Sequence, residues 1–103
     1  MVSPDAPYRR ALAIFEKALG PEHPDTAKSL DNLAGLYQVM GKYERAEPLH
    51  KRALAICETA LGADHPNTVT CRENLAACLR AMGRDAEAKE LLERANGASA
   101  PQQ

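Results

Sequence analysis

The sequence has no tryptophan and only four other aromatic side chains, three Tyr and one Phe, among its 103 residues. Strands favour aromatic and β-branched side chains, so this scarcity disfavours a β-sandwich or barrel. Charge of one sign is also lacking, because 13 Lys and Arg nearly balance 14 Asp and Glu. A nucleic-acid binder usually carries a strongly basic face, and a disordered chain combines low hydrophobicity with high net charge. With 45% hydrophobic residues, the chain is expected to be globular, with no nucleic-acid partner.

Long apolar runs are missing as well. The longest are about five residues, as in 75–79, whereas a membrane span needs about 20. The chain does not open on a basic segment followed by an apolar one, which would indicate a secretory leader. Its three cysteines are an odd number without C-x-x-C spacing, and this usage is typical of a reducing compartment. We therefore expect a cytoplasmic chain with no membrane partner.

An internal repeat organises most of the chain. A shift of 42 residues aligns Arg10–Gly35 with Arg52–Ala77, and 15 of these 26 positions are identical. The match continues more sparsely, with Met40-Gly41 on Met82-Gly83 and Ala46 on Ala88. Because such a period indicates one structural unit used twice, the fold is interpreted in terms of repeats.

Within one repeat, the apolar positions recur at steps of three and four residues, the stripe of an amphipathic helix. Glycines follow each stripe, where helices end, and prolines stand where helix starts are expected. Pro48 interrupts one stripe near its beginning and predicts a kink there instead of a break. The predicted helices are Pro7–Leu19, Pro24–Met40, Tyr43–Leu61, Pro66–Met82 and Arg84–Ala95.

The small and aromatic positions of the repeat resemble those of the tetratricopeptide repeat, a helix-turn-helix unit. The matching residues are Asn32-Leu33-Ala34, Tyr37, Gly41-x-Tyr43, Ala46 and Ala53-Leu54. The usual unit has 34 residues. The longer unit here, with its Leu-Gly-x-x-His-Pro-x-Thr connector, is similar to the repeats of kinesin light chain and nephrocystin-like proteins. The resemblance implies an all-α fold, a right-handed α-solenoid of antiparallel helix pairs.

This interpretation divides the chain into an N-terminal extension (1–7), a repeat domain (8–95) and a disordered C-terminal tail (96–103). The repeat domain comprises a half unit (8–23) and two units (24–65 and 66–95). The second unit departs from the first, with Arg72 in the position of Leu30 and Asp85 in that of Tyr43. These departures place its packing, but not its fold, in question.

The first helix of each pair is expected to line the concave side of the superhelix. Asn32 and Asn74 then project into one groove, one repeat apart, where an amide can pair with the N–H and C=O of an extended peptide. In kinesin-light-chain-like proteins such asparagines hold cargo peptides, and the resemblance implies the same role here. Alternatively, they satisfy a neighbouring helix backbone. The predicted peptide-binding residues are Lys28, Asn32, Gly35, Asn74, Ala77 and Arg80.

Lys28 and Arg80 are candidates for binding an acidic residue of the ligand, or are simply solvated. The two-carboxylate clamp of chaperone-binding members is disfavoured, because Asp31 and Gly35 occupy positions where that subfamily has Lys and Asn. The chain is thus predicted to be a scaffold for protein–protein interaction with a protein or peptide partner.

The alternative function is self-association, as a homodimer or as part of a longer array. The first predicted helix lacks a partner helix of its own, and a repeat buries its apolar face only against a neighbour. Four residues on this helix are the predicted self-association surface: Tyr8, Leu12, Phe15 and Leu19.

No catalytic or metal site is predicted. Cys57, Cys71 and Cys78 align with Phe15, Ser29 and Leu36, so these positions do not require thiols and we expect buried, structural cysteines. His23 and His65 recur with the connector and predict loop or helix-capping roles, while His50 replaces Tyr8 and is expected to pack on the second helix. No phosphate loop or nucleophile motif occurs. We expect no cofactor and no enzymatic activity.

Overall fold

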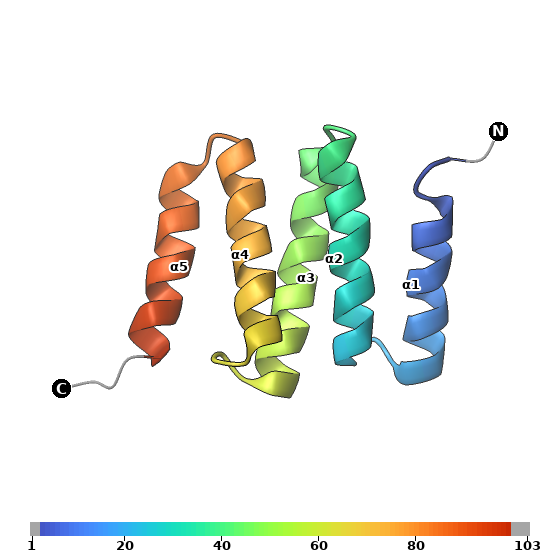
Figure 1. Ribbon diagram of the computed structural model, residues 1–103, viewed down its shortest axis with the longest axis horizontal. Helices are drawn as coiled ribbons and strands as arrows, with labels where there is room; N and C mark the ends of the chain where they lie inside the picture. The colour runs from blue at the N-terminus through green and yellow to red at the C-terminus, as the bar shows by residue number, and fades with distance from the viewer. Residues whose placement is uncertain (1–2, 100–103) are drawn as a thin grey trace.

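The computed structural model describes residues 3–99, which form five helices joined by short loops (Figure 1). No strand occurs within that range. The helices are α1 (Ala6–Leu19), α2 (Pro24–Val39), α3 (Tyr43–Leu61), α4 (Pro66–Ala81) and α5 (Asp85–Ser99). Residues 1–2 of the predicted extension and 100–103 of the predicted tail lie outside the described part.

Local chemistry determines where the first four helices begin and end. Gly20 and Gly62 follow α1 and α3 with φ of 99° and 92°, a region of backbone space that is strained for any residue with a Cβ. Pro24 and Pro66 occupy the first positions of α2 and α4, where the missing N–H has no helical partner in any case. The observed bounds of these four helices differ from the predicted ones by at most one residue.

Two helices continue through residues that can interrupt a helix, α3 at Pro48 and α5 at Asn96-Gly97. α3 runs through Pro48 without a break, because the proline is near the helix start, where only one carbonyl loses its donor. α5 extends to Ser99, four residues beyond the expected end. Residues 96–99, predicted to belong to a disordered tail, are therefore helical, and the Asn96-Gly97 pair, which often ends a helix, does not end this one.

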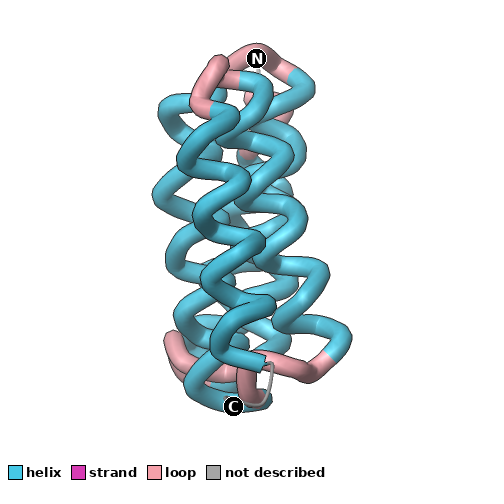
Figure 2. Tube along the Cα trace, turned by 90° about the vertical axis from the view of Figure 1, so that its left-hand side faces the viewer, coloured by secondary structure: helices cyan, strands magenta, loops and turns pink. Residues whose placement is uncertain are grey.

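The helices stack in sequence order, each antiparallel to the next, and the loops lie along the two edges of the stack, where the helices end (Figures 1 and 2). The stack measures 57 × 33 × 15 Å. Over the described residues, the backbones of α2 and α4 also approach each other, whereas α1 with α3 and α3 with α5 do not. The stack is therefore tighter on the side of α2 and α4, as expected for the inner side of a curved solenoid.

Small side chains allow the helices to approach closely. Ala27, Ala34, Ala46, Ala53 and Ala76 are completely buried. Around them, leucines of α2, α3 and α4 form the core, with half-buried Leu91 and Leu92 of α5 packed against it. The described part is thus an all-α solenoid, and in it no helix has the length and apolar character needed to cross a membrane.

Arg72 takes the place of the core residue Leu30 in the second unit and is itself buried. Its guanidinium donates to the carbonyl of Ala63 at 3.3 Å and lies 3.7 Å from Glu58. The apolar stem of an arginine can pack while its charged end reaches a polar partner. The second unit accommodates the substitution in this way.

Candidate functional site

A hollow of about 200 Å³ lies between α2 and α4 on the tighter side of the stack. Three of the six predicted peptide-binding residues line it: Lys28 and Asn32 from α2, and Asn74 from α4. Thr70 and Asn67 add further hydrogen-bonding groups from α4, so most of the lining side chains are polar. We call this hollow and the exposed faces of α2 and α4 beside it the inner groove.

The two asparagine side chains are available for a ligand. Asn32 is exposed and Asn74 half-buried. Within the described part of the chain, the side-chain hydrogen bonds involve other residues and not these two amides. The alternative role of satisfying a helix backbone thus has no hydrogen bond to support it there. Each amide presents a donor and an acceptor to the inner groove.

The remaining three predicted residues do not line the hollow. Gly35 is half-buried one turn beyond Asn32, and Ala77 and Arg80 are exposed on α4. Because positions three or four apart share one face of a helix, they continue the line of the asparagines toward the C-terminal ends of α2 and α4. A peptide in the inner groove would reach them only by extending past the hollow.

Beneath the hollow lies a buried polar network that the sequence did not reveal. His50 of α3 is only 2% exposed. Its Nδ1 donates to Asp31 Oδ1 at 2.9 Å, and its Nε2 contacts Gln38, also on α2. Cys71 of α4 donates to Asp31 Oδ2 at 3.1 Å. Asp31 therefore connects three helices, and the expectation that His50 packs on the second helix is confirmed.

The network does not have the arrangement of a nucleophile site. A catalytic cysteine needs a histidine within reach of its sulfur to take the proton, but Asp31 stands between Cys71 and His50. Burial, together with the hydrogen bond to Asp31, raises the pKa of the Cys71 thiol far above its ordinary value. A thiol kept protonated is a poor nucleophile, so this geometry favours a structural role.

Both connector histidines cap helices, as predicted. His23 Nδ1 accepts a hydrogen bond from the backbone N–H of Asp25, and His65 Nδ1 accepts one from Asn67, each at 3.0 Å. These N–H groups lie in the first turn, where a helix offers them no partner. No group of three or more His, Cys, Asp or Glu side chains suited to a metal ion occurs in the described part.

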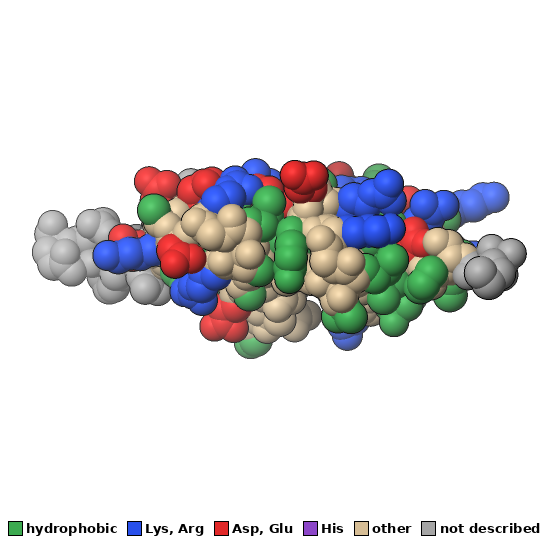
Figure 3. All heavy atoms as spheres, turned by 90° about the horizontal axis from the view of Figure 1, so that it is seen from above, with side chains coloured by type: hydrophobic (Ala, Val, Ile, Leu, Met, Phe, Trp, Pro, Cys, Tyr) green, Lys and Arg blue, Asp and Glu red, His purple; other side chains and the backbone are tan. Residues whose placement is uncertain are grey.

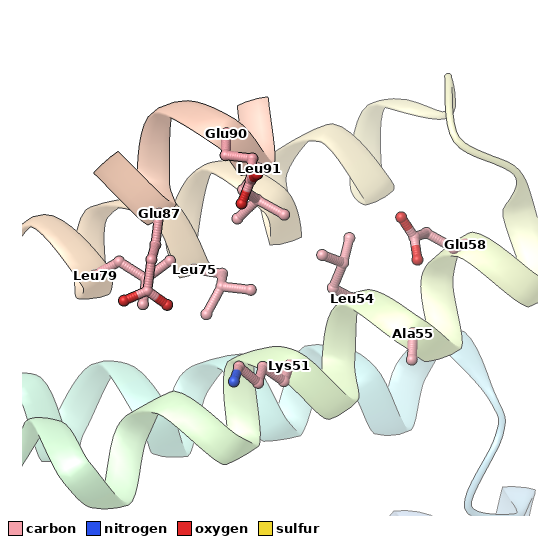
Figure 4. A pocket seen from close by; sticks show the side chains of 9 residues that line it. All are labelled: Lys51, Leu54, Ala55, Glu58, Leu75, Leu79, Glu87, Glu90 and Leu91. Atoms are coloured by element: carbon pink, nitrogen blue, oxygen red, sulfur yellow. The ribbon is translucent and has the colours of Figure 1, made fainter. Parts of the chain in front are cut away.

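A second hollow, of about 300 Å³, lies between α3 and α5 and has α4 as its floor (Figure 4). Leucines of all three helices form its base, and charged side chains stand at its edge. Most of these charges have partners: Glu87 binds Arg84, Lys51 binds Glu47, and Glu58 lies near Arg72. This hollow could not be predicted from the sequence, because it depends on the distance between α5 and α3.

The predicted self-association surface lies on α1. Tyr8, Phe15 and Leu19 are exposed, at 40%, 36% and 43%, while Leu12 packs against the core. Ile14, which was not predicted, is 59% exposed. Apolar side chains gather toward the N-terminal end in the view from above (Figure 3). Three of the four predicted residues are therefore exposed, and the fourth, Leu12, is part of the packing beneath them.

The apolar face of α1 is exposed because it lacks a neighbour that α3 has. In the 42-residue register, Tyr8, Ile14 and Phe15 correspond to His50, Ile56 and Cys57, each only 2% exposed. α3 is packed between α2 and α4, whereas the backbone of α1 lies against α2 and not against α3, which α1 reaches through the ion pair of Glu16 with Arg52. A helix equivalent to α2, on the other side of α1, would supply that neighbour.

Comparisons with known proteins agree with this geometry. Two tetratricopeptide repeat family models match, one over residues 30–95 and one over residues 5–25. Nephrocystin-3 of Xenopus laevis is 49% identical over 45 residues, which is 44% of this chain and 4% of that protein. Nephrocystin-3 of Mus musculus is also 49% identical over 45 residues, 44% of this chain and 3% of its own length.

The protein named KINESIN LIGHT CHAIN-RELATED 2 of Arabidopsis thaliana is 46% identical over 39 residues, 38% of this chain and 6% of its own. The chain thus spans only a few per cent of the length of these relatives. One family model nevertheless covers well over half of the chain, including four of its five helices in whole or in part. On these grounds, the chain belongs to the tetratricopeptide repeat family.

Proposed function

We propose that the chain binds an extended segment of a partner protein in the inner groove. Tetratricopeptide repeats generally mediate protein–protein interaction. A binding surface of this family is built on stacked helix pairs, whose inner faces form an extended concave surface. In this chain that surface is provided by α2 and α4, which approach each other and enclose the hollow.

The pair Asn32 and Asn74 carries the proposal. They are equivalent positions of the two units, line one hollow, and offer four hydrogen-bonding groups to a peptide backbone. Gly35 and Ala77, small residues one turn further on, allow a peptide backbone to come near both helices. Repetition of the same amide one unit apart suits a repeating ligand such as an extended main chain.

The charges at the inner groove suggest a further feature of the ligand. Lys28 is exposed beside Asn32, and Arg80 is exposed on α4 past the hollow. An acidic side chain at either end of the bound segment would receive a charge-assisted hydrogen bond. Asp25 and Asp31 also line the hollow, so its centre is better suited to uncharged groups than to a carboxylate.

The test compares Asn32→Ala and Asn74→Ala with the wild type, first in a pull-down from the source cell and then with the identified segment by titration calorimetry. Each substitution should weaken binding by about 1–3 kcal/mol, because a buried group of the ligand loses its partner. Thr59→Ala, on the outer face of α3, is the control. Unchanged affinity in both asparagine variants would contradict the proposed groove.

We infer a second candidate, self-association through α1, from the exposure of Tyr8, Ile14 and Phe15 at positions that α3 buries. An exposed apolar face of this kind often marks a site of protein–protein contact. Ile14→Lys should shift a concentration-dependent sedimentation profile toward the monomer. Val39→Lys removes an apolar side chain that is 86% exposed elsewhere and should leave the profile unchanged. A wild-type monomer at all concentrations would refute this candidate.

We further infer a non-catalytic scaffold in the cytoplasm. The inner groove is lined mainly by amide, hydroxyl and charged side chains, and, in the part of the chain that the structure describes, neither of its two cysteines is hydrogen-bonded to a histidine. The cysteines are free thiols, as expected in a reducing compartment. Near-neutral net charge favours a protein partner over nucleic acid or a membrane surface.

A further inference from the structure

Two of the buried thiols lie side by side at the junction of the two repeat units. Cys57 of α3 and Cys71 of α4 are 2% and 4% exposed, and their Sγ atoms are 3.4 Å apart. A disulfide bond is about 2.05 Å long, so the sulfurs need to approach by about 1.4 Å, which is within the range of small side-chain rotations. Both residues are in regular helix, so the two sulfurs lie at the contact between α3 and α4.

The pair is confined to this junction. The equivalents of Cys57 and Cys71 in the preceding unit are Phe15 and Ser29, so neither thiol is a requirement of the repeat. Cys57 and Cys71 also belong to the lining of the inner-groove hollow. A small solute that enters the hollow beside Asn32 and Asn74 therefore meets both sulfurs, despite their low exposure.

We propose that Cys57 and Cys71 are a modification site, a dithiol that a peroxide oxidises to an intramolecular disulfide linking the two repeat units beneath the inner groove. The sulfur of one cysteine attacks the peroxide, whose O–O bond breaks to give a sulfenic acid and one water. The second sulfur then attacks the first, an S–S bond forms, and the S–O bond breaks to release a second water. Two thiols lose two electrons and two protons, and hydrogen peroxide is reduced to two waters.

Asp31 is placed to assist and to report this reaction. It accepts the hydrogen bond of the Cys71 thiol at 3.1 Å, so it can receive that proton as the sulfur attacks. Once the disulfide forms, Asp31 Oδ2 loses this donor while Oδ1 keeps His50. Asp31 lines the hollow as well, so oxidation changes the acceptor groups at the floor of the inner groove.

Slow reaction is expected, because burial and Asp31 raise the pKa of Cys71 and the thiolate is the reactive form. The site would therefore respond to sustained oxidant and not to brief exposure. In a reducing compartment the bond would be transient.

The test treats the reduced chain with hydrogen peroxide and digests it with trypsin after alkylation. Cleavage at Arg52 and Arg72 places Cys57 and Cys71 in one peptide, 53–72, and Cys78 in another, 73–80. We expect peptide 53–72 to lose the mass of two hydrogens while peptide 73–80 is alkylated. Closing this loop should raise the Tm of the oxidised chain by about 10–15 °C, reversibly with reductant.

Two variants make the outcome decisive. Cys71→Ser, which copies the buried Ser29 of the preceding unit, should fold and lose both the mass change and the Tm shift. Cys78→Ser should keep both. Sulfinic acid on Cys57 without a disulfide, or disulfide-linked dimers through Cys78, would overturn the proposal. Because no peptide ligand takes part, this result is independent of whether the inner groove binds a partner.

Discussion

At the scale of single residues, the contact between Tyr37 and Asp5 ties the start of the chain to α2. The Tyr37 hydroxyl donates to Asp5 Oδ2 at 2.8 Å, across 32 residues of sequence. Hydrogen bonds from Ser3 and Tyr37 lower the pKa of Asp5 from 3.8 to about 2. A carboxyl whose pKa is lower in the folded than in the unfolded state stabilises the fold above its unfolded pKa. That stabilisation is lost as the pH falls from about 4 to about 2.

Because the pKa of Asp5 is lowered in the folded state, the stability of the Tyr37→Phe variant relative to the wild type should depend on pH. The variant should be less stable than the wild type at pH 5–7, because Asp5 loses a donor, and the difference should shrink between pH 4 and pH 2. Urea unfolding at several pH values measures it. Tyr43→Phe, at a half-buried tyrosine of the next helix, should show a difference that does not change over this range. A difference in the free energy of unfolding between Tyr37→Phe and the wild type that stays constant with pH would mean that the Tyr37 hydroxyl does not lower the pKa of Asp5.

The network of His50, Asp31 and Cys71 shows what the sequence could not predict at this scale. Its members are 19 and 40 residues apart, and their equivalents in the repeat are Leu92, Glu73 and Ser29. Neither copy of the repeat contains all three residues. The repeat pattern therefore predicts the fold but not this network. Its formation depends on stacking α2, α3 and α4, which only the tertiary structure specifies.

At the scale of helices, the ends could be predicted where residues close by in the sequence determine them. Glycine after α1 and α3 and proline at the start of α2 and α4 act within a few residues, and those boundaries are correct to one residue. The end of α5 was predicted less well, since the Asn96-Gly97 pair is a typical stop signal but the helix continues through it to Ser99. In the candidate site, α2 and α4 supply Asn32 and Asn74 to one hollow, but how far that hollow extends could not be predicted.

The histidine caps give a prediction at this scale. His23→Ala removes the acceptor for the N–H of Asp25 and should lower the free energy of unfolding by about 1 kcal/mol, while His23→Asn should restore most of it because asparagine is a good cap. His65→Ala should have a similar effect, since the geometry at Asn67 is the same. Guanidinium unfolding of the four chains measures it, and equal stability of His23→Ala and wild type would contradict the capping role.

Two glycines allow helix stability to be separated from binding. Gly35 is inside α2, has ordinary helical backbone, and has no atom within 4 Å of an added Cβ. Gly35→Ala should therefore stabilise the chain by about 0.5–1 kcal/mol. If the inner groove needs a close approach to Gly35, affinity for the bound segment should fall while stability rises. Loss of both would show that position 35 supports the fold instead.

Gly62→Ala is the matched opposite case. The site is open, but φ of +92° with ψ of 160° is strained for a residue with a Cβ, at a cost of about 1–3 kcal/mol. Thermal unfolding should therefore shift in opposite directions for the two substitutions. Because Gly62 is outside the lining of the hollow, its effect on ligand affinity should follow only from the fraction folded.

At the scale of the whole molecule, the stack is best packed at its centre and most exposed at α1. α3 has a helix packed on each side, whereas α1 has one helix packed on it, α2, and this difference accounts for the exposure of Tyr8, Ile14 and Phe15. A solenoid is stabilised by nearest-neighbour interfaces. One more helix of the α2 type should therefore stabilise the molecule and cover the surface proposed for self-association.

The repeat register defines how to add that helix. Residues 24–46 end one position before Glu47, the equivalent of Asp5, so a copy of 24–46 placed directly before Asp5 continues the 42-residue spacing. The extended chain should have a higher Tm than the wild type and a sedimentation coefficient independent of concentration. A copy of 24–46 with Leu30 and Leu33 changed to Asp is the control and should do neither. Unaltered concentration dependence in the extended chain would show that α1 is not the associating surface.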